Sequence, residues 1–180
     1  MLARFFGCCA VFAVFALTSA LAAPATFQAG EDAYVALHFG EAKAAYEAAA
    51  ASGTPKDRAD SLRQLGVMSW RIDGKLADAE RYFRQALGTG ADVSATQVEF
   101  ARFLASEKRF DEAATAGDAS LAAAATSAER HAALHACAQS ILLKVEGVAI
   151  GAQSPADVQR LAHVRDAMRS ASAAPPMPLD

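Results

Sequence analysis

A four-residue pattern recurs along this chain at a spacing that constrains its fold more than any other feature. Phe39-Gly40-Glu41-Ala42 is followed by Leu76-Ala77-Asp78-Ala79 and then by Phe110-Asp111-Glu112-Ala113. The final alanines are separated by steps of 37 and 34 residues. A fixed period in the thirties is typical of repeated helical hairpins, because each hairpin buries its apolar face only by stacking on its neighbours. The spacing therefore predicts an all-α chain with about three stacked hairpins.

Helix-start and helix-stop signals divide the chain into eight predicted helices. Thr54 and Ser154 each precede a proline and an acid at the third helical position, which resembles a capping box. Thr126-Ser127-Ala128-Glu129 and Ser94-Ala95-Thr96-Gln97 match the capping box itself. Stops are expected at Gly53, Gly74, Gly88 or Gly90, and Gly151. These signals place helices near residues 26–37, 40–51, 55–72, 75–88, 94–106, 109–124, 127–149 and 155–170.

Residues inside the repeats resemble the tetratricopeptide repeat (TPR) family. That family has a Leu-Gly pair in its first helix, and in its second helix a small residue followed four places later by an aromatic one. Leu65-Gly66 matches the pair, whereas the first unit has Ala29-Gly30 there, and Gly117 stands at the aromatic position of the third unit. The resemblance covers about residues 34–121 and implies these packing positions: Ala42, Tyr46, Leu65, Gly66, Ala79, Phe83, Phe110 and Ala113.

The resemblance implies a right-handed stack of antiparallel helical hairpins (an α-α superhelix). About three TPR-like units would be followed by a C-terminal capping hairpin over 127–170, which lacks the family signature. Its helices carry apolar stripes that include Leu142 and Val145 in the first and Val158, Leu161 and Met168 in the second. The alternative is a helical bundle without true repeats. The predicted domains are a signal peptide (1–22), a repeat domain (23–170) and a flexible proline-rich tail (171–180).

The N-terminus has the three regions of a secretory signal. A short basic start ending at Arg4 precedes an apolar core over Phe5–Leu17, and Ala20-Leu21-Ala22 fits a small-x-small cleavage site. We therefore expect a periplasmic or secreted protein without an integral membrane span after cleavage. The alternative is an uncleaved membrane anchor, since the apolar run extends to Ala25.

The charge and the cysteine content of the chain limit the functions that it can have. Removal of residues 1–22 takes away one arginine and leaves 16 basic and 20 acidic residues, a net charge of −4 without any block of like charge. Nucleic acid is therefore a poor candidate partner. Cys137 is the one cysteine that remains, so no internal disulfide is available and stability must come from packing. Its apolar neighbours predict a buried thiol rather than a nucleophile.

The sequence contains little that suggests catalysis. His131 and His135 stand one helical turn apart, but a closed zinc site needs four ligands and a catalytic one three, and no glutamate lies directly between them. Neither a phosphate-binding loop nor a nucleophile elbow is present. We therefore predict no enzymatic activity and no cofactor, with metal binding at His131 and His135 as a distant alternative.

The predicted function is to bind a protein or peptide through the concave surface of the stack. In the TPR family that surface is lined mainly by the first helix of each hairpin, which here implies Arg63, Val67, Trp70, Arg71 and Arg102. A basic strip beside an indole suits a peptide carboxylate or an acidic segment. The alternatives are a solvated face with Trp70 packed on the first hairpin, and a structural subunit of a larger cell-envelope assembly.

Overall fold

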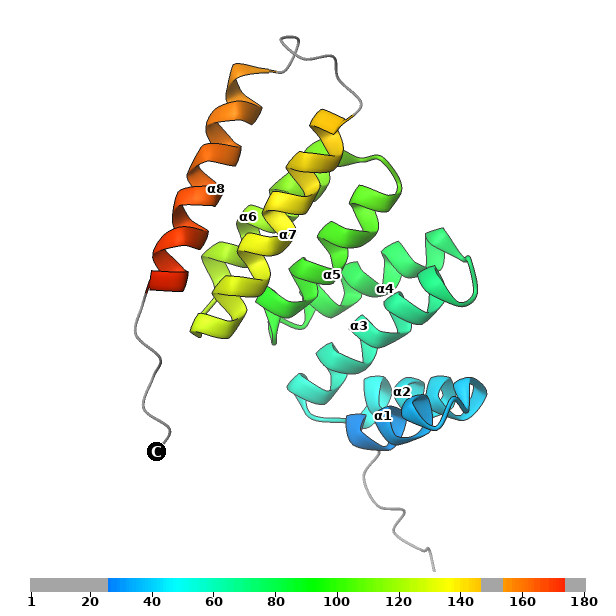
Figure 1. Cartoon of the computed structure of the whole chain (residues 1–180). Coiled ribbons are helices and arrows are strands. Elements are labelled where there is room, and N and C mark those ends of the chain that lie inside the picture. Colours follow the sequence, from blue (N-terminus) through cyan, green and yellow to red (C-terminus); the bar gives the residue numbers. More distant parts are fainter. Residues whose placement is uncertain (1–25, 147–153, 174–180) are drawn as a thin grey trace, which may run out of the picture.

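All regular structure in the described part of the chain is helical (Figure 1). The computed structural model describes residues 26–146 and 154–173, so the predicted signal peptide and residues 174–180 lie outside it. The all-α prediction is confirmed, and each helix starts within one residue of its predicted position. The eight helices are α1 (Phe27–Val35), α2 (Phe39–Ser52), α3 (Pro55–Arg71), α4 (Leu76–Gly88), α5 (Val93–Ser106), α6 (Phe110–Ala123), α7 (Ser127–Glu146) and α8 (Pro155–Ala173).

Consecutive helices pack as pairs, α1 with α2, α3 with α4, α5 with α6, and α7 with α8. The first helices of successive pairs also contact one another, α1 with α3, α3 with α5, and α5 with α7. Among the described residues, the backbones of the second helices of the first three pairs do not approach in this way, neither α2 to α4 nor α4 to α6. The first helices therefore share one side of the molecule, which faces the reader in Figure 1.

The turns inside the first three hairpins repeat with the sequence period. Leu37, Gly74 and Lys108 each adopt a positive φ, of 62°, 66° and 61°, and each lies two residues before the second helix of its hairpin. From Leu37 to Gly74 is 37 residues and from Gly74 to Lys108 is 34, the same steps that separate the repeated alanines. A left-handed residue is a common way to end a helix, because it lets the following amides reach the last free carbonyls. The echo in the sequence thus corresponds to a repeated backbone turn.

Small and aromatic residues face each other across the first two hairpins. A Cβ added to Gly30 would lie 2.3 Å from ring carbons of Tyr46, and one added to Gly66 would lie 3.0 Å from the Phe83 ring. Both rings are fully buried, together with the repeated alanines Ala42, Ala79 and Ala113. Glycine is needed on the first helix because the ring from the second helix fills the place of its side chain.

The third hairpin does not pair a glycine of its first helix with an aromatic ring of its second helix. Ala101 and Gly117 are both buried, and a Cβ on Gly117 would lie 2.8 Å from Sγ of Cys137. The missing aromatic residue of this unit is therefore compensated by close approach of α7. This contact also explains the burial of Cys137, which confirms the prediction that its thiol is enclosed.

Of the four predicted capping boxes, two are present and one is wrong, while the box at Ser154 stays a prediction. Thr54 with Asp57, and Thr126 with Glu129, make the reciprocal bonds of the motif. The prediction of a cap at Ser94 is wrong because α5 begins one residue earlier, at Val93, after Asp92 in the left-handed conformation. Ser94 is instead buried inside the helix, where it exchanges hydrogen bonds with Ser120 of α6. The position of Ser94 is decided by the buried hydrogen-bond acceptor Ser120 on α6. The local sequence does not reveal this contact.

Candidate protein-binding groove

The first helices α3, α5 and α7 surround an open hollow of about 400 Å³, which we call the α3–α5–α7 groove. A smaller hollow of about 270 Å³ continues it toward the other end of α7. Four of the five residues predicted for binding line the groove, and Trp70 lines the smaller hollow with Arg71 and Arg102. The lining of the groove is Arg63, Gln64, Val67, Arg71, Ser94, Ala95, Val98, Glu99, Arg102, Glu129 and Ala132.

Two arginines in the groove share one carboxylate. Arg102 Nη1 lies 2.5 Å from Glu99 Oε1, and Arg71 Nη2 lies 3.9 Å from Glu99 Oε2. The Arg71 side chain is 53% exposed, whereas Glu99 is only 22% exposed. Two positive charges against one negative charge leave this cluster with a charge of +1, so its guanidinium donors retain capacity for another acceptor.

The indole of Trp70 contacts the guanidinium of Arg71, and Trp70 is itself half-buried. The Arg71 guanidinium lies 4.5 Å above the centre of the indole ring, within the range of a cation–π contact. The indole packs edge-on against Phe103 of α5, with ring centres 5.9 Å apart. Trp70 therefore packs toward the third hairpin, which corrects the alternative that it packs on the first.

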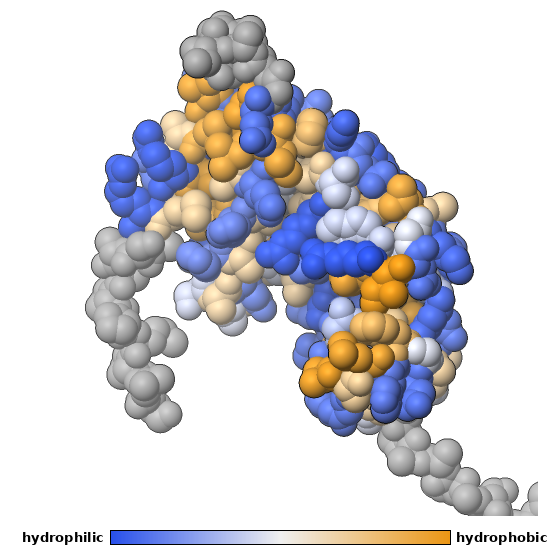
Figure 2. Space-filling view, turned by 45° about the vertical axis from the view of Figure 1, so that its right-hand side comes forward, coloured by the Kyte–Doolittle hydropathy of each residue, from blue (hydrophilic) through white to orange (hydrophobic). Residues whose placement is uncertain are grey.

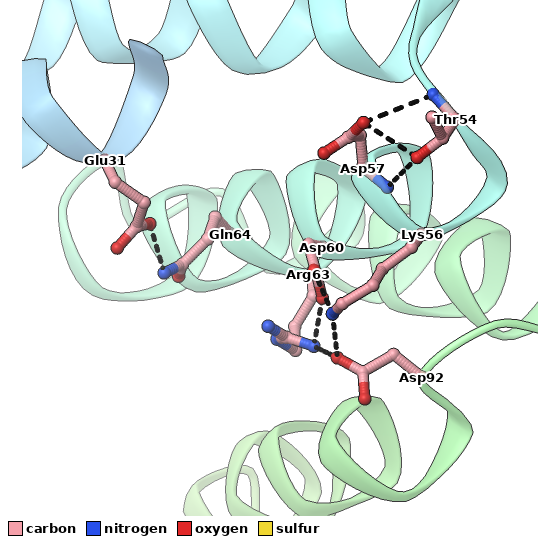
Figure 3. A network of polar contacts seen from close by, with 8 residues as sticks. All are labelled: Glu31, Thr54, Lys56, Asp57, Asp60, Arg63, Gln64 and Asp92. Atoms are coloured by element: carbon pink, nitrogen blue, oxygen red, sulfur yellow. Dashed lines mark hydrogen bonds and ion pairs between the residues drawn. The ribbon is translucent and has the colours of Figure 1, made fainter. Parts of the chain in front are cut away.

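Arg63 lies at one end of the groove in a network of opposite charges (Figure 3). Its Nη1 is 2.6 Å from Asp92 Oδ2 and 2.8 Å from Asp60 Oδ1, and its side chain is only 15% exposed. Lys56 completes the network at 2.8 Å from Asp60 Oδ2. The guanidinium of Arg63 is therefore already neutralised, so the basic strip expected from the sequence is reduced to Arg71 and Arg102.

The pKa values of the two acids in this network are shifted in opposite directions. Burial raises the pKa of Asp60, and hydrogen bonding with the neighbouring Asp92 raises it further. Lys56 and Arg63 act in the opposite direction but do not outweigh these effects. Burial also acts to raise the pKa of Asp92, but hydrogen bonding with Asp60 and Arg63 outweighs it, so this pKa lies below its ordinary value. The network joins α3 to the start of α5 and so sets the spacing of two helices that line the groove.

Among the groove residues that the sequence analysis missed, three carry a charge or an amide: Gln64, Glu99 and Glu129. Gln64 donates to Glu31 of α1, which also accepts a 2.5 Å hydrogen bond from the Tyr46 hydroxyl. Glu99 was detectable, because it lies three residues before Arg102 and so on the same helix face. Glu129 has no comparable local signal, since α7 reaches the groove only through packing.

The predicted chemistry of the last hairpin has little geometric support. His131 and His135 are both exposed on α7. Among residues 26–146 and 154–173, no group of three or more His, Cys, Asp or Glu side chains is arranged to hold a metal ion. Burial raises the pKa of the Cys137 thiol to about 11, which keeps it protonated near neutral pH.

Comparison with known proteins identifies no relative. No family model, no curated protein and no solved structure matches this chain. In the part of the chain that the structure describes, no helix has the length and hydrophobicity needed to cross a membrane. The residues of the groove itself are therefore the basis for proposing a function.

Proposed function

We propose that this protein is an exported, TPR-like scaffold that binds a segment of another protein in the α3–α5–α7 groove. The observation that carries the proposal is the hollow itself, formed by the first helices of three successive hairpins and lined by an unbalanced arginine cluster. Successive first helices approach one another while α2, α4 and α6 do not, which supports a curved stack with this groove on its concave side. The right hand of the superhelix is what the resemblance to TPR repeats implies.

The shape of the groove favours a peptide over a small molecule. Small-molecule sites bury most of their ligand in a cleft lined mainly by apolar residues. This groove is open, extends across three helices, and carries charged and polar residues in its middle. Figure 2 shows a hydrophilic band across the hollowed face of the molecule. Such a surface suits a chain segment that makes several polar contacts along its length.

The arginine cluster favours a ligand with a carboxylate. The Arg71 guanidinium is held over the Trp70 ring, so part of the entropy cost of ordering its side chain is already met before a ligand arrives. Arginine can bind a carboxylate through two parallel N–H···O bonds. An acidic side chain or a terminal carboxylate placed beside Glu99 would bring the cluster from +1 to neutral. We therefore infer an acidic segment as the preferred ligand.

The predicted signal peptide supports a periplasmic or secreted location, where the partner would also be found. The proposal includes no catalytic step, cofactor or nucleic-acid partner. A structural subunit of a cell-envelope assembly is the second candidate, favoured by the exposed apolar residues Leu142 and Val158 on the last hairpin.

The groove is tested by capturing partners from the protein's own cells with tagged variants. Arg71→Ala and Arg102→Ala should each reduce the captured partner about tenfold or more, the loss expected for a charge-assisted hydrogen bond of 1.5–3 kcal/mol. Arg84→Ala is the matched control, because Arg84 is also exposed and paired with a glutamate of its own helix, but lies on α4. Equal capture by all three folded variants would place the interface elsewhere.

Export is tested separately by mass spectrometry of the native protein. The mature N-terminus should be Ala23, which follows the predicted cleavage site. An intact Met1 in the membrane fraction would instead establish an anchor.

A further inference from the structure

The last hairpin has an apolar hollow that no other part of the described chain covers. This α7–α8 hollow lies between the two helices and has a volume of about 550 Å³. In Figure 2 hydrophobic residues gather at this end of the molecule. The hollow shares no lining residue with the α3–α5–α7 groove, so an inference about it goes beyond the proposed function. Its lining includes Ala138, Leu142, Val145, Val158, Leu161 and Ala162.

In the first two hairpins, an aromatic residue of the second helix packs with the first helix of the next hairpin. Tyr46 of α2 shares an apolar cluster with Leu65 and Met68 of α3. The Phe83 ring of α4 lies 5.7 Å from the Phe103 ring of α5, measured between the ring centres. Tyr46 and Phe83 are each the eighth residue of their helix. The eighth position therefore marks where the following first helix packs.

The third hairpin follows this rule, whereas in the described chain no helix follows the fourth. Gly117, the eighth residue of α6, is so close to α7 that an added Cβ would lie 2.8 Å from Cys137 Sγ. Ala162, the eighth residue of α8, lines the hollow instead, with Val158 at the fourth position, which is 50% exposed. The fourth residue is fully buried in the earlier second helices, at Ala42, Ala79 and Ala113. The hollow therefore corresponds to the place of a following first helix.

We propose that the α7–α8 hollow binds one amphipathic α-helix of another protein, which packs as the first helix of a further hairpin would. Residues 174–180 of this chain include three prolines, and proline is excluded from helix interiors. Residues 1–22 are the predicted signal peptide, and residues 147–153 connect α7 to α8. None of these segments suits the role of that helix, so its source is a partner.

The dimensions of the hollow match a single helix. Its lining on α8 extends from Val158 to Met168, a length of about 15 Å or roughly three helical turns. Over that length an amphipathic helix presents about four apolar side chains on one face, at positions i, i+3, i+4 and i+7. Insertion of such a face into an apolar groove is a common mode of protein recognition. The partner is therefore expected to contribute about three turns of helix.

The edge of the hollow on α8 has an unbalanced positive charge. The Asp166 carboxylate lies 2.9 Å from Arg165 Nη2 and 3.9 Å from Arg169 Nη1, and the two arginine side chains are 61% and 75% exposed. Two positive charges against one negative charge leave +1, so guanidinium donors remain for another acceptor. Within the stack, ion pairs also connect consecutive hairpins, as Lys144 of α7 does with Asp111 of α6. The partner helix should therefore carry a carboxylate beside its apolar face.

The experiment measures binding of a labelled synthetic helix to the protein as isolated from its host, by fluorescence anisotropy. The probe has about 18 residues, with leucine at i, i+3, i+4 and i+7 and glutamate beside that face. We expect saturable binding that weakens about tenfold or more in Leu142→Glu and in Val158→Glu, because each variant places a charge against apolar side chains. Both residues are half-exposed, so the variants should keep the helical circular dichroism and the melting temperature of the parent.

A second probe with lysine in place of glutamate tests the charge. It should bind the parent protein several-fold more weakly, and the difference should shrink when Arg165→Ala and Arg169→Ala are combined. Two control variants should leave binding of the first probe unchanged. Val35→Glu makes the same apolar-to-acid change at a 78% exposed residue near the other end of the stack. Arg71→Ala removes a positive charge from the α3–α5–α7 groove.

Three results would overturn the proposal. The first is equally tight binding of a scrambled probe, whose leucines do not share one face. The second is binding that both folded hollow variants leave unchanged, or that Arg71→Ala abolishes, since the probe would then bind elsewhere. The third concerns sedimentation equilibrium, in which we expect a monomer: a dimer that Leu142→Glu and Val158→Glu dissociate would assign the hollow to a second copy of the chain.

Discussion

At the scale of single residues, close contacts and buried charges account for most of the specificity in this molecule. Gly30 and Gly66 give up their side-chain space to Tyr46 and Phe83, and the added methyl of an alanine would meet the ring in both cases. Asp60 illustrates the second effect, because its buried carboxylate is stable only next to the cations that surround it. Substitutions at such positions are expected to be costly although the residues look unremarkable in the sequence.

Gly30→Ala should destabilise the protein by about 1–3 kcal/mol through overpacking. The Tyr46 ring is fully buried and its hydroxyl is held by Glu31, so it cannot move aside without losing that bond. Gly40→Ala is the control, since nothing lies within 4 Å of a Cβ at Gly40. That change should be neutral or stabilise by up to about 1 kcal/mol. Urea unfolding measures the change in stability for both variants. Equal changes would show that the contact of Gly30 with the Tyr46 ring does not limit the side chain at this position.

Arg63→Ala should cost about 3 kcal/mol, the lower end of the range for breaking a buried ion pair, because Lys56 remains as a partner of Asp60. Arg81→Ala removes an exposed ion pair with Asp78 and a cation–π contact with Tyr82, and should change stability much less than Arg63→Ala. Thermal and urea unfolding check the difference. If Arg63→Ala proved as mild as Arg81→Ala, the network would be a surface feature and Arg63 would again be a candidate for binding.

At the scale of helices, local capping fixes some helix starts, and a contact with another helix decides others. Thr54 shows the first case, since its hydroxyl accepts from the amide of Asp57 while the Asp57 carboxylate accepts from the Thr54 amide. Ser94 shows the second, since its hydroxyl is engaged by Ser120 of α6 and α5 starts before it. Locally capped helices are therefore the ones whose starts respond to a single substitution.

Thr54→Ala should destabilise the protein by about 1 kcal/mol, the typical cost of losing an N-cap. Thr115→Ala is the control, because Thr115 is exposed inside α6 and its hydroxyl bonds a carbonyl of its own helix. Removing that bond should be neutral or slightly stabilising. Chemical denaturation at one pH compares the two, and a loss at Thr115 as large as that at Thr54 would show that the cap is not responsible.

At the scale of the whole molecule, ion pairs connect each hairpin to the next. Lys43 of α2 pairs with Asp73 in the following hairpin, and Glu80 of α4 pairs with Arg109 at the start of α6. Lys43 and Glu80 each directly follow a repeated alanine and carry opposite charges, and their partners flank the turn residue, Asp73 just before Gly74 and Arg109 just after Lys108. The reversal of charge favours the correct neighbour over a shifted one, because a shifted stack would bring like charges together.

The pair at Glu80 predicts a pH effect on global stability. Hydrogen bonding from Arg109 holds the pKa of Glu80 below its ordinary value of 4.5. The unfolded chain then binds the proton more tightly than the folded one, so this stabilisation is complete above pH 4.5 and is lost as the pH falls from there through the lower pKa of the folded state. In Glu80→Gln, unfolding measured from neutral pH to about pH 3 should show a shallower loss of stability.

Glu41→Gln, the same change of charge on the exposed face of α2, controls for net charge in this experiment. An acid profile of Glu80→Gln that is as steep as the parent profile would mean that the Glu80–Arg109 pair does not stabilise the fold.

Local information in the sequence was sufficient to predict the helices and their repetition. Alanine-rich segments, Pro55 and Pro155, the acid after Thr54, and the echo at Ala42, Ala79 and Ala113 all act within a few residues of where they stand. Every predicted helix start is within one residue of the observed one. The same periodicity placed Val67, Arg71 and Arg102 on one face of the stack.

Only the tertiary structure decided which of these residues remain available to a partner. Arg63 and Asp92 are 29 residues apart, and Trp70 and Phe103 are 33 apart, yet packing of α3 on α5 brings each pair into contact. Packing also left an apolar hollow between α7 and α8 open among the described residues. A sequence states the charge and size of each side chain, whereas its pairing and exposure depend on neighbours supplied by distant helices.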